Sequence, residues 1–170
     1  MTLEEAGNSV GTLAATLSAG NLSYNNLGAL NINQITADVT STLHFVGQGS
    51  ITLGTVTGVT TVGGSIDIQT HGGGANLTSV VTNGNISSNG GTGVSGGEIL
   101  LISSGNIDLA GNVTGVGDGA GKTAGKITVQ AAGTVKVSAL TSTGTNTAAS
   151  NLVQIKAGTT IDQYAGTAIT

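Results

Sequence analysis

Short runs of alternating apolar residues recur along this chain with one fixed internal spacing. Each copy has apolar residues at positions 0 and 2, then a short turn of Gly, Ala, Ser or Asn, then another apolar residue at position 8 and usually one at position 10. The aligned segments are 22–32, 43–53, 99–109, 127–137 and 153–163. Alternation with a period of two, punctuated by glycine, predicts strand–turn–strand in every copy.

A sixth copy begins with Ile66 and Ile68, but an insertion around residues 71–74 displaces its second strand, which we expect to resume near Leu77. A third, more variable strand follows in each copy, for example Val113 to Val116. A hairpin sandwich would also contain short alternating strands. The fixed offset of eight residues favours instead one corner repeated coil after coil, an all-β solenoid of about six coils of roughly 21–33 residues.

Stacked coils bury columns of aliphatic side chains, and the composition suits such a stack. The chain is 38% hydrophobic but only 7% charged and 2% aromatic, and it has 30 glycines, whereas an ordinary soluble domain is about 25% charged. Each coil would bury several Ile, Val or Leu side chains at about 1.5–3 kcal/mol each before the entropy cost. We expect residues 1–170 to form a single β-solenoid segment, an internal fragment of a much longer repeat protein.

Charged residues offer an independent check of the register. In the alignment, position 9 is Asp108, Lys136 and Asp162 in successive copies, and Glu98 stands under Lys126 just before the first strand. These residues did not enter the alignment. We therefore expect cross-coil pairs of opposite charge on the outer surface.

The charge and residue inventory excludes several partners. Four lysines, no arginine and a net charge of −4 leave little to neutralise a phosphate backbone, so nucleic acid is excluded as a partner. No window approaches 18 consecutive apolar residues, so we expect no membrane insertion. Cysteine is absent, which removes disulfides and thiolate metal sites. No cofactor is expected.

Three glycine-rich stretches match the sequence patterns of catalytic motifs by chance. Residues 93–97 match G-x-S-x-G around Ser95, residues 91–96 match G-x-G-x-x-G, and residues 117–123 resemble a phosphate-binding loop. All three motifs require a following helix, whereas residues 98–102 and 126–130 read as strands. Asp118 resembles one ligand of a calcium-binding repeat, but a single copy cannot complete an oxygen cage. We interpret these stretches as turns between coils.

The two histidines do not form a paired metal site in the sequence. His44 should point outward beside the first-strand apolar pair, and His71 lies in the insertion. The insertion is the best candidate contact loop because it alone interrupts the coil. Its residues are His71, Gly72, Gly73, Gly74 and Asn76. We assign no catalytic, cofactor-binding or metal-binding residues.

The chain resembles the repeat region of filamentous haemagglutinin-like exoproteins, the secreted adhesins of two-partner secretion systems. The resemblance rests on residues 6–15 followed by 28–32, which look like the start of a recurrent module, and on coils such as 104–109 and 132–137. It implies a right-handed parallel β-helix, export across the outer membrane, and an extracellular or bacterial outer-surface location. It also implies a role as adhesive stalk or rigid spacer in attachment or biofilm.

We therefore expect a non-catalytic structural or adhesive segment and not an enzyme. Its partners would be glycans or proteins on host or neighbouring cells, with end-to-end self-association as a further option, because the terminal strands have few charges and no proline to guard them. A carbohydrate-binding or carbohydrate-active β-helix is one alternative, although the eight carboxylates are scattered. An ice-binding solenoid is another, although the outward columns mix Asn, Thr, Asp and Lys.

Overall fold

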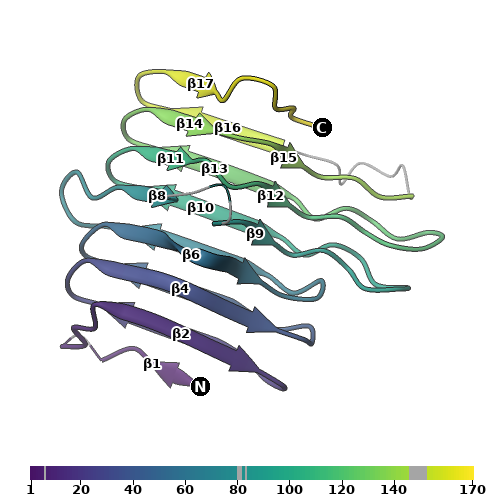
Figure 1. The fold of residues 1–170 in the computed structure, drawn as a ribbon, viewed down its shortest axis with the longest axis horizontal. Helices are drawn as coiled ribbons and strands as arrows, with labels where there is room; N and C mark the ends of the chain where they lie inside the picture. The colour runs from purple at the N-terminus through teal and green to yellow at the C-terminus, as the bar shows by residue number, and fades with distance from the viewer. Residues whose placement is uncertain (6, 80–81, 83, 146–152) are drawn as a thin grey trace.

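The chain folds into a right-handed parallel β-helix, described here from a computed structural model for residues 1–5, 7–79, 82, 84–145 and 153–170. The described residues contain strands, turns and bends, and no helix. In Figure 1 the chain rises from the N-terminus at the bottom to the C-terminus at the top, while front strands point to the right and back strands to the left. This sense of winding makes the coil right-handed, as is usual for parallel connections within one sheet.

One wall of the coil is a seven-stranded parallel sheet. Its order is β1-β3-β5-β7-β10-β13-β16. The strands are β1 (Thr2–Leu3), β3 (Leu22–Asn26), β5 (Leu43–Gly47), β7 (Ile66–Thr70), β10 (Ile99–Ser103), β13 (Ile127–Ala131) and β16 (Val153–Ala157). From β3 onward, each strand begins at the first residue of a copy identified in the sequence, so the predicted register is confirmed. The short β1 adds one strand that the repeat did not contain.

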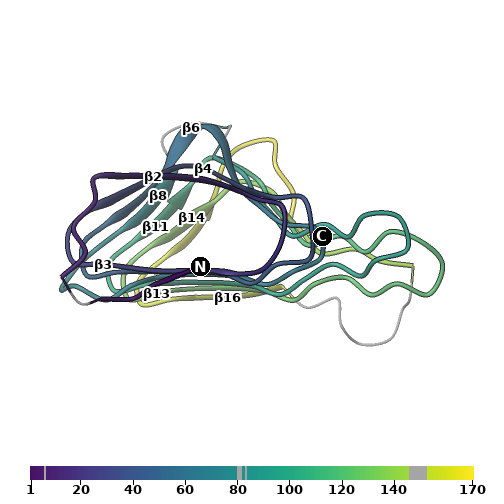
Figure 2. The ribbon, with the colours of Figure 1, turned by 90° about the horizontal axis from the view of Figure 1, so that it is seen from below.

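The opposite wall is a ten-stranded parallel sheet (Figure 2). In the N-terminal coils its strands are long and continuous: β2 (Thr12–Leu17), β4 (Leu30–Ala37) and β6 (Ile51–Thr60). Beyond β6 each coil contributes two short strands instead: β8 (Leu77–Ser79) and β9 (Ile86–Ser87), β11 (Ile107–Leu109) and β12 (Val113–Thr114), β14 (Val135–Val137) and β15 (Leu140–Thr141), and finally β17 (Ile161–Gln163) alone. The predicted second strands, including the displaced one at Leu77, and the predicted third strand at Val113 are therefore confirmed.

The core lies between the two walls and follows directly from the alternation in the sequence. Strands of both walls alternate buried and partly exposed residues, as in β10 of the seven-stranded sheet and β11 of the ten-stranded sheet. The column Tyr24, Phe45, Ile68, Leu101 and Val129 is at most 2% exposed throughout. Because the strands stack in register, every inner side chain packs against its equivalents in the coils above and below.

Three glycine-rich loops project together from one corner of the helix, residues 88–98, 115–126 and, as far as described, 142–145 (Figures 1 and 2). Backbone hydrogen bonds join them, for example Gly93 N to Asp118 O at 3.0 Å and Gly117 N to Thr143 O at 2.9 Å. The projecting loops are therefore stacked like the coils themselves.

Candidate contact surface

The predicted contact loop is a corner of the coil between β7 and β8. His71, Gly73 and Gly74 are exposed, whereas Gly72 and Asn76 are partly buried. Gly74 has a φ of 73°, in the left-handed region, which suits a tight turn at the exposed tip. The loop therefore presents its tip to solvent while its base belongs to the frame of the solenoid.

Gly72 anchors this loop to the preceding and following coils. A Cβ atom at Gly72 would lie 1.7 Å from the carbonyl oxygen of Gln48, so only glycine fits. The Gly72 carbonyl accepts hydrogen bonds from the Ala75 N–H at 2.9 Å and from the Ser104 hydroxyl. Gly72 thus has a structural role that the sequence did not reveal.

Asn76 belongs to a set of corner asparagines that join successive coils. Its side-chain oxygen accepts a hydrogen bond from the Asn106 N–H at 2.7 Å, and that of Asn106 accepts one from the Thr134 N–H at 2.8 Å. Asn21, Asn85 and Asn89 accept backbone N–H groups in the same way. Asparagine at these corners satisfies backbone donors that the turns leave without a ladder partner. Asn76 therefore also has a structural role at the base of the predicted contact loop.

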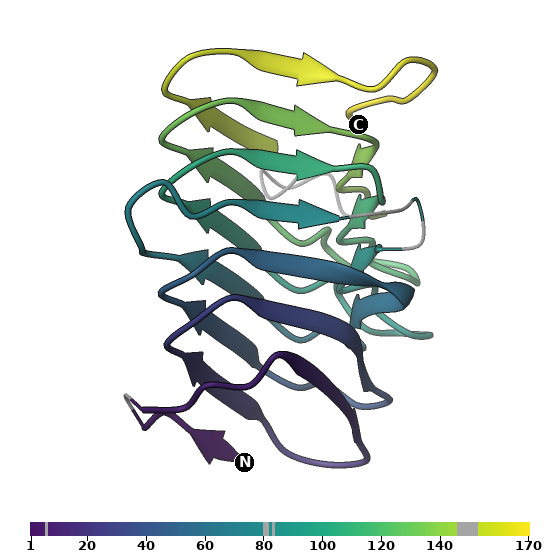
Figure 3. The same cartoon turned by 60° about the vertical axis from the view of Figure 1, so that its left-hand side comes forward.

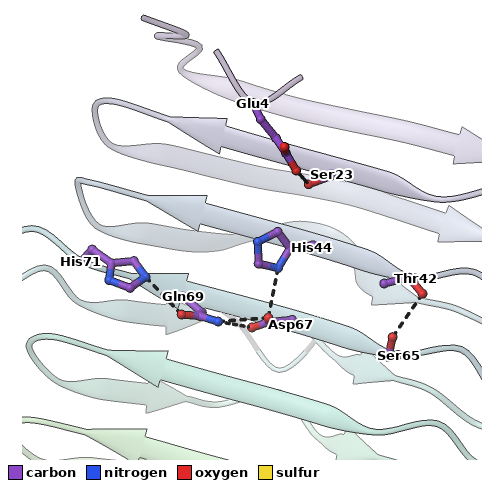
Figure 4. Close-up of polar contacts among 8 residues, drawn as sticks. All are labelled: Glu4, Ser23, Thr42, His44, Ser65, Asp67, Gln69 and His71. Atoms are coloured by element: carbon purple, nitrogen blue, oxygen red, sulfur yellow. Dashed lines mark hydrogen bonds and ion pairs between the residues drawn. The ribbon is translucent and has the colours of Figure 1, made fainter. Parts of the chain in front are cut away.

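His71 is instead connected to His44 by a string of polar side chains on the outer face of the seven-stranded sheet (Figure 4). His71 Nε2 lies 3.1 Å from Gln69 Oε1, and Gln69 Nε2 donates to both carboxylate oxygens of Asp67 at 2.9 and 3.0 Å. Asp67 Oδ2 lies 3.0 Å from Nδ1 of His44 in the preceding coil. We call His44, Asp67, Gln69 and His71 the polar string.

Two residues of the polar string, His44 and Asp67, line a shallow groove of about 270 Å³ on the same face. The groove is lined by Thr42, His44, Ser65, Ile66, Asp67, Glu98 and Leu100. Leu100 and its strand neighbour Ile102 occupy outward positions, so an apolar surface lies directly beside the polar string. The structure thus brings together His71 and His44, which the sequence placed in separate coils, and adds Asp67, Gln69 and Leu100. Their outward positions in neighbouring copies were the available signal.

The glycine-rich motifs form part of the projecting loops. Ser95 Oγ accepts a hydrogen bond from the Thr123 N–H at 3.2 Å, and Val94 pairs with Asp118 in an antiparallel bridge. Strands β10 and β13 follow these loops, as expected. The hydroxyl of Ser95 therefore caps a neighbouring loop.

The ten-stranded sheet carries an outward column of hydroxyl side chains that the sequence alignment missed. The register places them in successive coils: Thr16, Thr36, Thr60, Ser87, Thr114 and Thr141. We call them the hydroxyl column. The alignment missed it because the number of residues between the second and third strands varies from coil to coil.

The expected charge ladder has the predicted register but different contacts. Asp108 stands opposite Lys136, and Lys136 opposite Asp162. Across the described residues, however, His44–Asp67 is the one side-chain pair within ion-pair distance, so the expected Asp108–Lys136 and Glu98–Lys126 pairs are not formed. Lys136 Nζ lies 4.1 Å from the centre of the Tyr164 ring, a cation–π contact.

Tyr164 reaches across three coils from its position after β17. Its hydroxyl donates a hydrogen bond of 2.5 Å to Asp108 Oδ1. The hydrogen bond to Asp108, then burial, and then the Asp108 charge raise the pKa of Tyr164 above its ordinary 10.0. The neutral phenol is thus the form that the fold favours.

Among the described residues, no group of three or more His, Asp or Glu side chains is arranged to hold a metal ion. No helix in the described ranges has the length and apolar character needed to cross a membrane. Comparisons with protein-family models, with curated proteins and with solved structures find no match for this chain.

Proposed function

We propose that this chain is a non-catalytic, extracellular adhesive segment of a large bacterial surface or secreted protein, with the β-helix as a rigid support. The observation that carries the proposal is the outer face of the seven-stranded sheet. There a stack of five-residue strands in unbroken register, β3 to β16, holds the polar string beside the apolar surface of Leu100 and Ile102. The resemblance to filamentous haemagglutinin-like exoproteins supports the same role.

The chemistry of this face suits a hydroxyl-rich ligand such as a cell-surface glycan. A carboxylate accepts hydrogen bonds, a carboxamide both donates and accepts, and a neutral imidazole does the same. Leu100 adds an apolar surface for the C–H face of a sugar ring, and sites of this kind combine apolar lining with a few placed polar groups. Because β-strands hold these side chains, little conformational entropy is lost on binding.

The test is binding of the folded chain to a glycan panel and to intact cells. Replacing Gln69 and His71 together by alanine should weaken saturable binding about tenfold, because two ligand-facing groups are lost at about 0.5–1.5 kcal/mol each. Gln34→Ala, on the opposite sheet, is the matched control and should bind like the parent. Val135→Asp, which places a charge in the core, should abolish binding by disrupting the coil.

A folded chain without saturable binding would contradict adhesion through this face and leave the role of spacer. Equal losses in the Gln34→Ala protein and in the Gln69→Ala/His71→Ala protein would also contradict it, because the effect would then not depend on the face.

The hydroxyl column favours ice binding as a second candidate function. Its hydroxyls repeat at the spacing of stacked strands, about 4.8 Å. The neighbouring column is mixed, with Ala14, Gln34 and Gly58 at equivalent places, which makes this candidate the weaker one. Thermal hysteresis that is lost in Thr114→Lys but kept in the Gln69/His71 double variant would favour ice binding over adhesion.

A further inference from the structure

The groove on the outer face of the seven-stranded sheet crosses three successive middle coils. Its residues belong to strands β5, β7 and β10 or directly precede them, and these strands lie side by side in the stack (Figure 3). The hydroxyls of Thr42 and Ser65 lie along one edge of the groove, where Ser65 donates to Thr42 at 3.3 Å (Figure 4). Leu100 contributes an apolar surface, and the volume of about 270 Å³ suits about one sugar residue. The groove therefore offers polar and apolar contacts to a single ring.

Two carboxylates, those of Asp67 and Glu98, line the same groove. The Ile66 N–H donates to the Glu98 carbonyl at 2.9 Å, so Glu98 lies beside Ser65 in the neighbouring coil. Asp67 is two residues beyond Ser65 on the same face. A step of two residues along a strand and one strand across corresponds to about 8 Å between Cα atoms. Side chains at this spacing can both reach one ammonium group placed between them.

The negative charge of the groove is not neutralised by a lysine. Asp67 accepts hydrogen bonds from the Gln69 amide, which is neutral, and from His44, which is charged only when it is protonated. Glu98 is exposed and, in the part of the chain that the structure describes, has no ion-pair partner. Lys126 lies beside Glu98 in the next coil but does not line the groove. The groove is therefore complementary to a cationic ligand.

We propose that this groove selects glycans with free amino groups, such as polymers that contain unacetylated glucosamine, over acetylated and acidic glycans. A protonated amine gains charge-assisted hydrogen bonds to the carboxylates. An N-acetyl group carries no charge, and a uronic acid or sialic acid would bring a like charge to Asp67 and Glu98. This selectivity rests on the proposed adhesive function and concerns the same outer face.

The other groups of the groove favour an amino sugar over a lysine side chain, which also carries an ammonium group. A lysine side chain is an apolar stem with donors only at its tip, so it would leave the hydroxyls of Thr42 and Ser65 without a ligand partner. A sugar ring presents hydroxyls on its edge and C–H groups on its face. It can therefore contact these hydroxyls, Leu100 and the carboxylates together.

Calorimetric titration of the folded 170-residue chain with oligosaccharides of equal length tests this selectivity. At equal pH and ionic strength, glucosamine oligomers should bind about three- to tenfold more tightly than N-acetylglucosamine oligomers, and galacturonic acid oligomers should bind most weakly. Glu98→Gln should reduce the preference about two- to fourfold. Lys126→Gln should strengthen the binding of glucosamine oligomers by up to about twofold, because it removes a like charge beside the groove. Added salt should reduce the preference, because exposed charges are screened.

Asp162→Asn is the matched control, since it removes one carboxylate charge on the ten-stranded sheet, and it should keep the preference of the parent. An equal loss of preference in Asp162→Asn and Glu98→Gln overturns the inference, because overall charge would then be the cause. Lysine oligomers that bind as tightly as glucosamine oligomers overturn the assignment to a sugar.

The failure of this inference differs from the failure of the adhesive function. Acetylated or acidic glycans that bind as tightly as glucosamine oligomers, with a dependence on Gln69 and His71, overturn the selectivity and leave adhesion through this face intact. A folded chain that binds no glycan and no cell overturns both.

Discussion

At the scale of single residues, the glycines of the corner between β7 and β8 are not equivalent. A Cβ at Gly72 would meet the Gln48 carbonyl oxygen at 1.7 Å, whereas a Cβ at Gly73 would meet nothing within 4 Å. Gly72→Ala should therefore lower the free energy of unfolding by about 1–3 kcal/mol through overpacking against backbone. Gly73→Ala should change it by about 0.5 kcal/mol or less. Urea unfolding followed by circular dichroism measures both.

Equal stabilities of these two alanine variants would contradict the close approach of Gly72 to Gln48. The comparison matters for function because both residues were candidates for ligand contact in the sequence. A loss of binding in Gly72→Ala would report a distorted corner, whereas a loss in Gly73→Ala would report contact at the exposed tip.

At the scale of strands, the sequence predicted where each coil begins because inner columns must stay apolar in every copy. The strand starts at Leu22, Leu43, Ile66, Ile99 and Ile127 all follow from that requirement. It did not predict that β4 and β6 run on into the third strand, since a register shift after Ile32 breaks the template there. The sequence did not predict the polar string either, for a different reason. Outward residues are free to vary, so no column requirement marks Asp67 or Gln69.

Tyr164 links three strands at the C-terminal end, β11, β14 and its own predecessor β17. Tyr164→Phe keeps a ring over Lys136 but loses the hydrogen bond to Asp108, so it should lower the free energy of unfolding by about 0.5–1 kcal/mol at this partly exposed site. The raised pKa of Tyr164 makes this stabilisation of the folded chain depend on pH. The unfolded chain loses the phenol proton at lower pH than the folded chain, so this stabilisation is complete below pH 10 and is lost as the pH rises through the raised pKa.

Urea unfolding of the parent and of Tyr164→Phe at pH 8 and at pH 11 tests this link. The difference in stability between the two proteins should shrink at the higher pH. A difference that stays constant would show that the Tyr164 hydroxyl is not bonded to Asp108 in the folded chain.

At the scale of the whole molecule, each coil of the stack contacts only its neighbours. The loss of stability caused by a core substitution should therefore depend on the position of its coil along the axis. Leu101 and Ile155 occupy the same inner column, but Leu101 is fully buried in a middle coil and Ile155 is partly exposed in a terminal one. Leu101→Ala should cost about 2–5 kcal/mol, the usual range for a buried aliphatic side chain, and Ile155→Ala about half of that. Hydrogen exchange should likewise be faster in β16 and β17 than in β7 and β10, because the end coils open without disturbing the middle. Equal costs at the two positions, together with uniform exchange, would mean that the solenoid unfolds as one cooperative unit and that its ends are as firmly held as its centre.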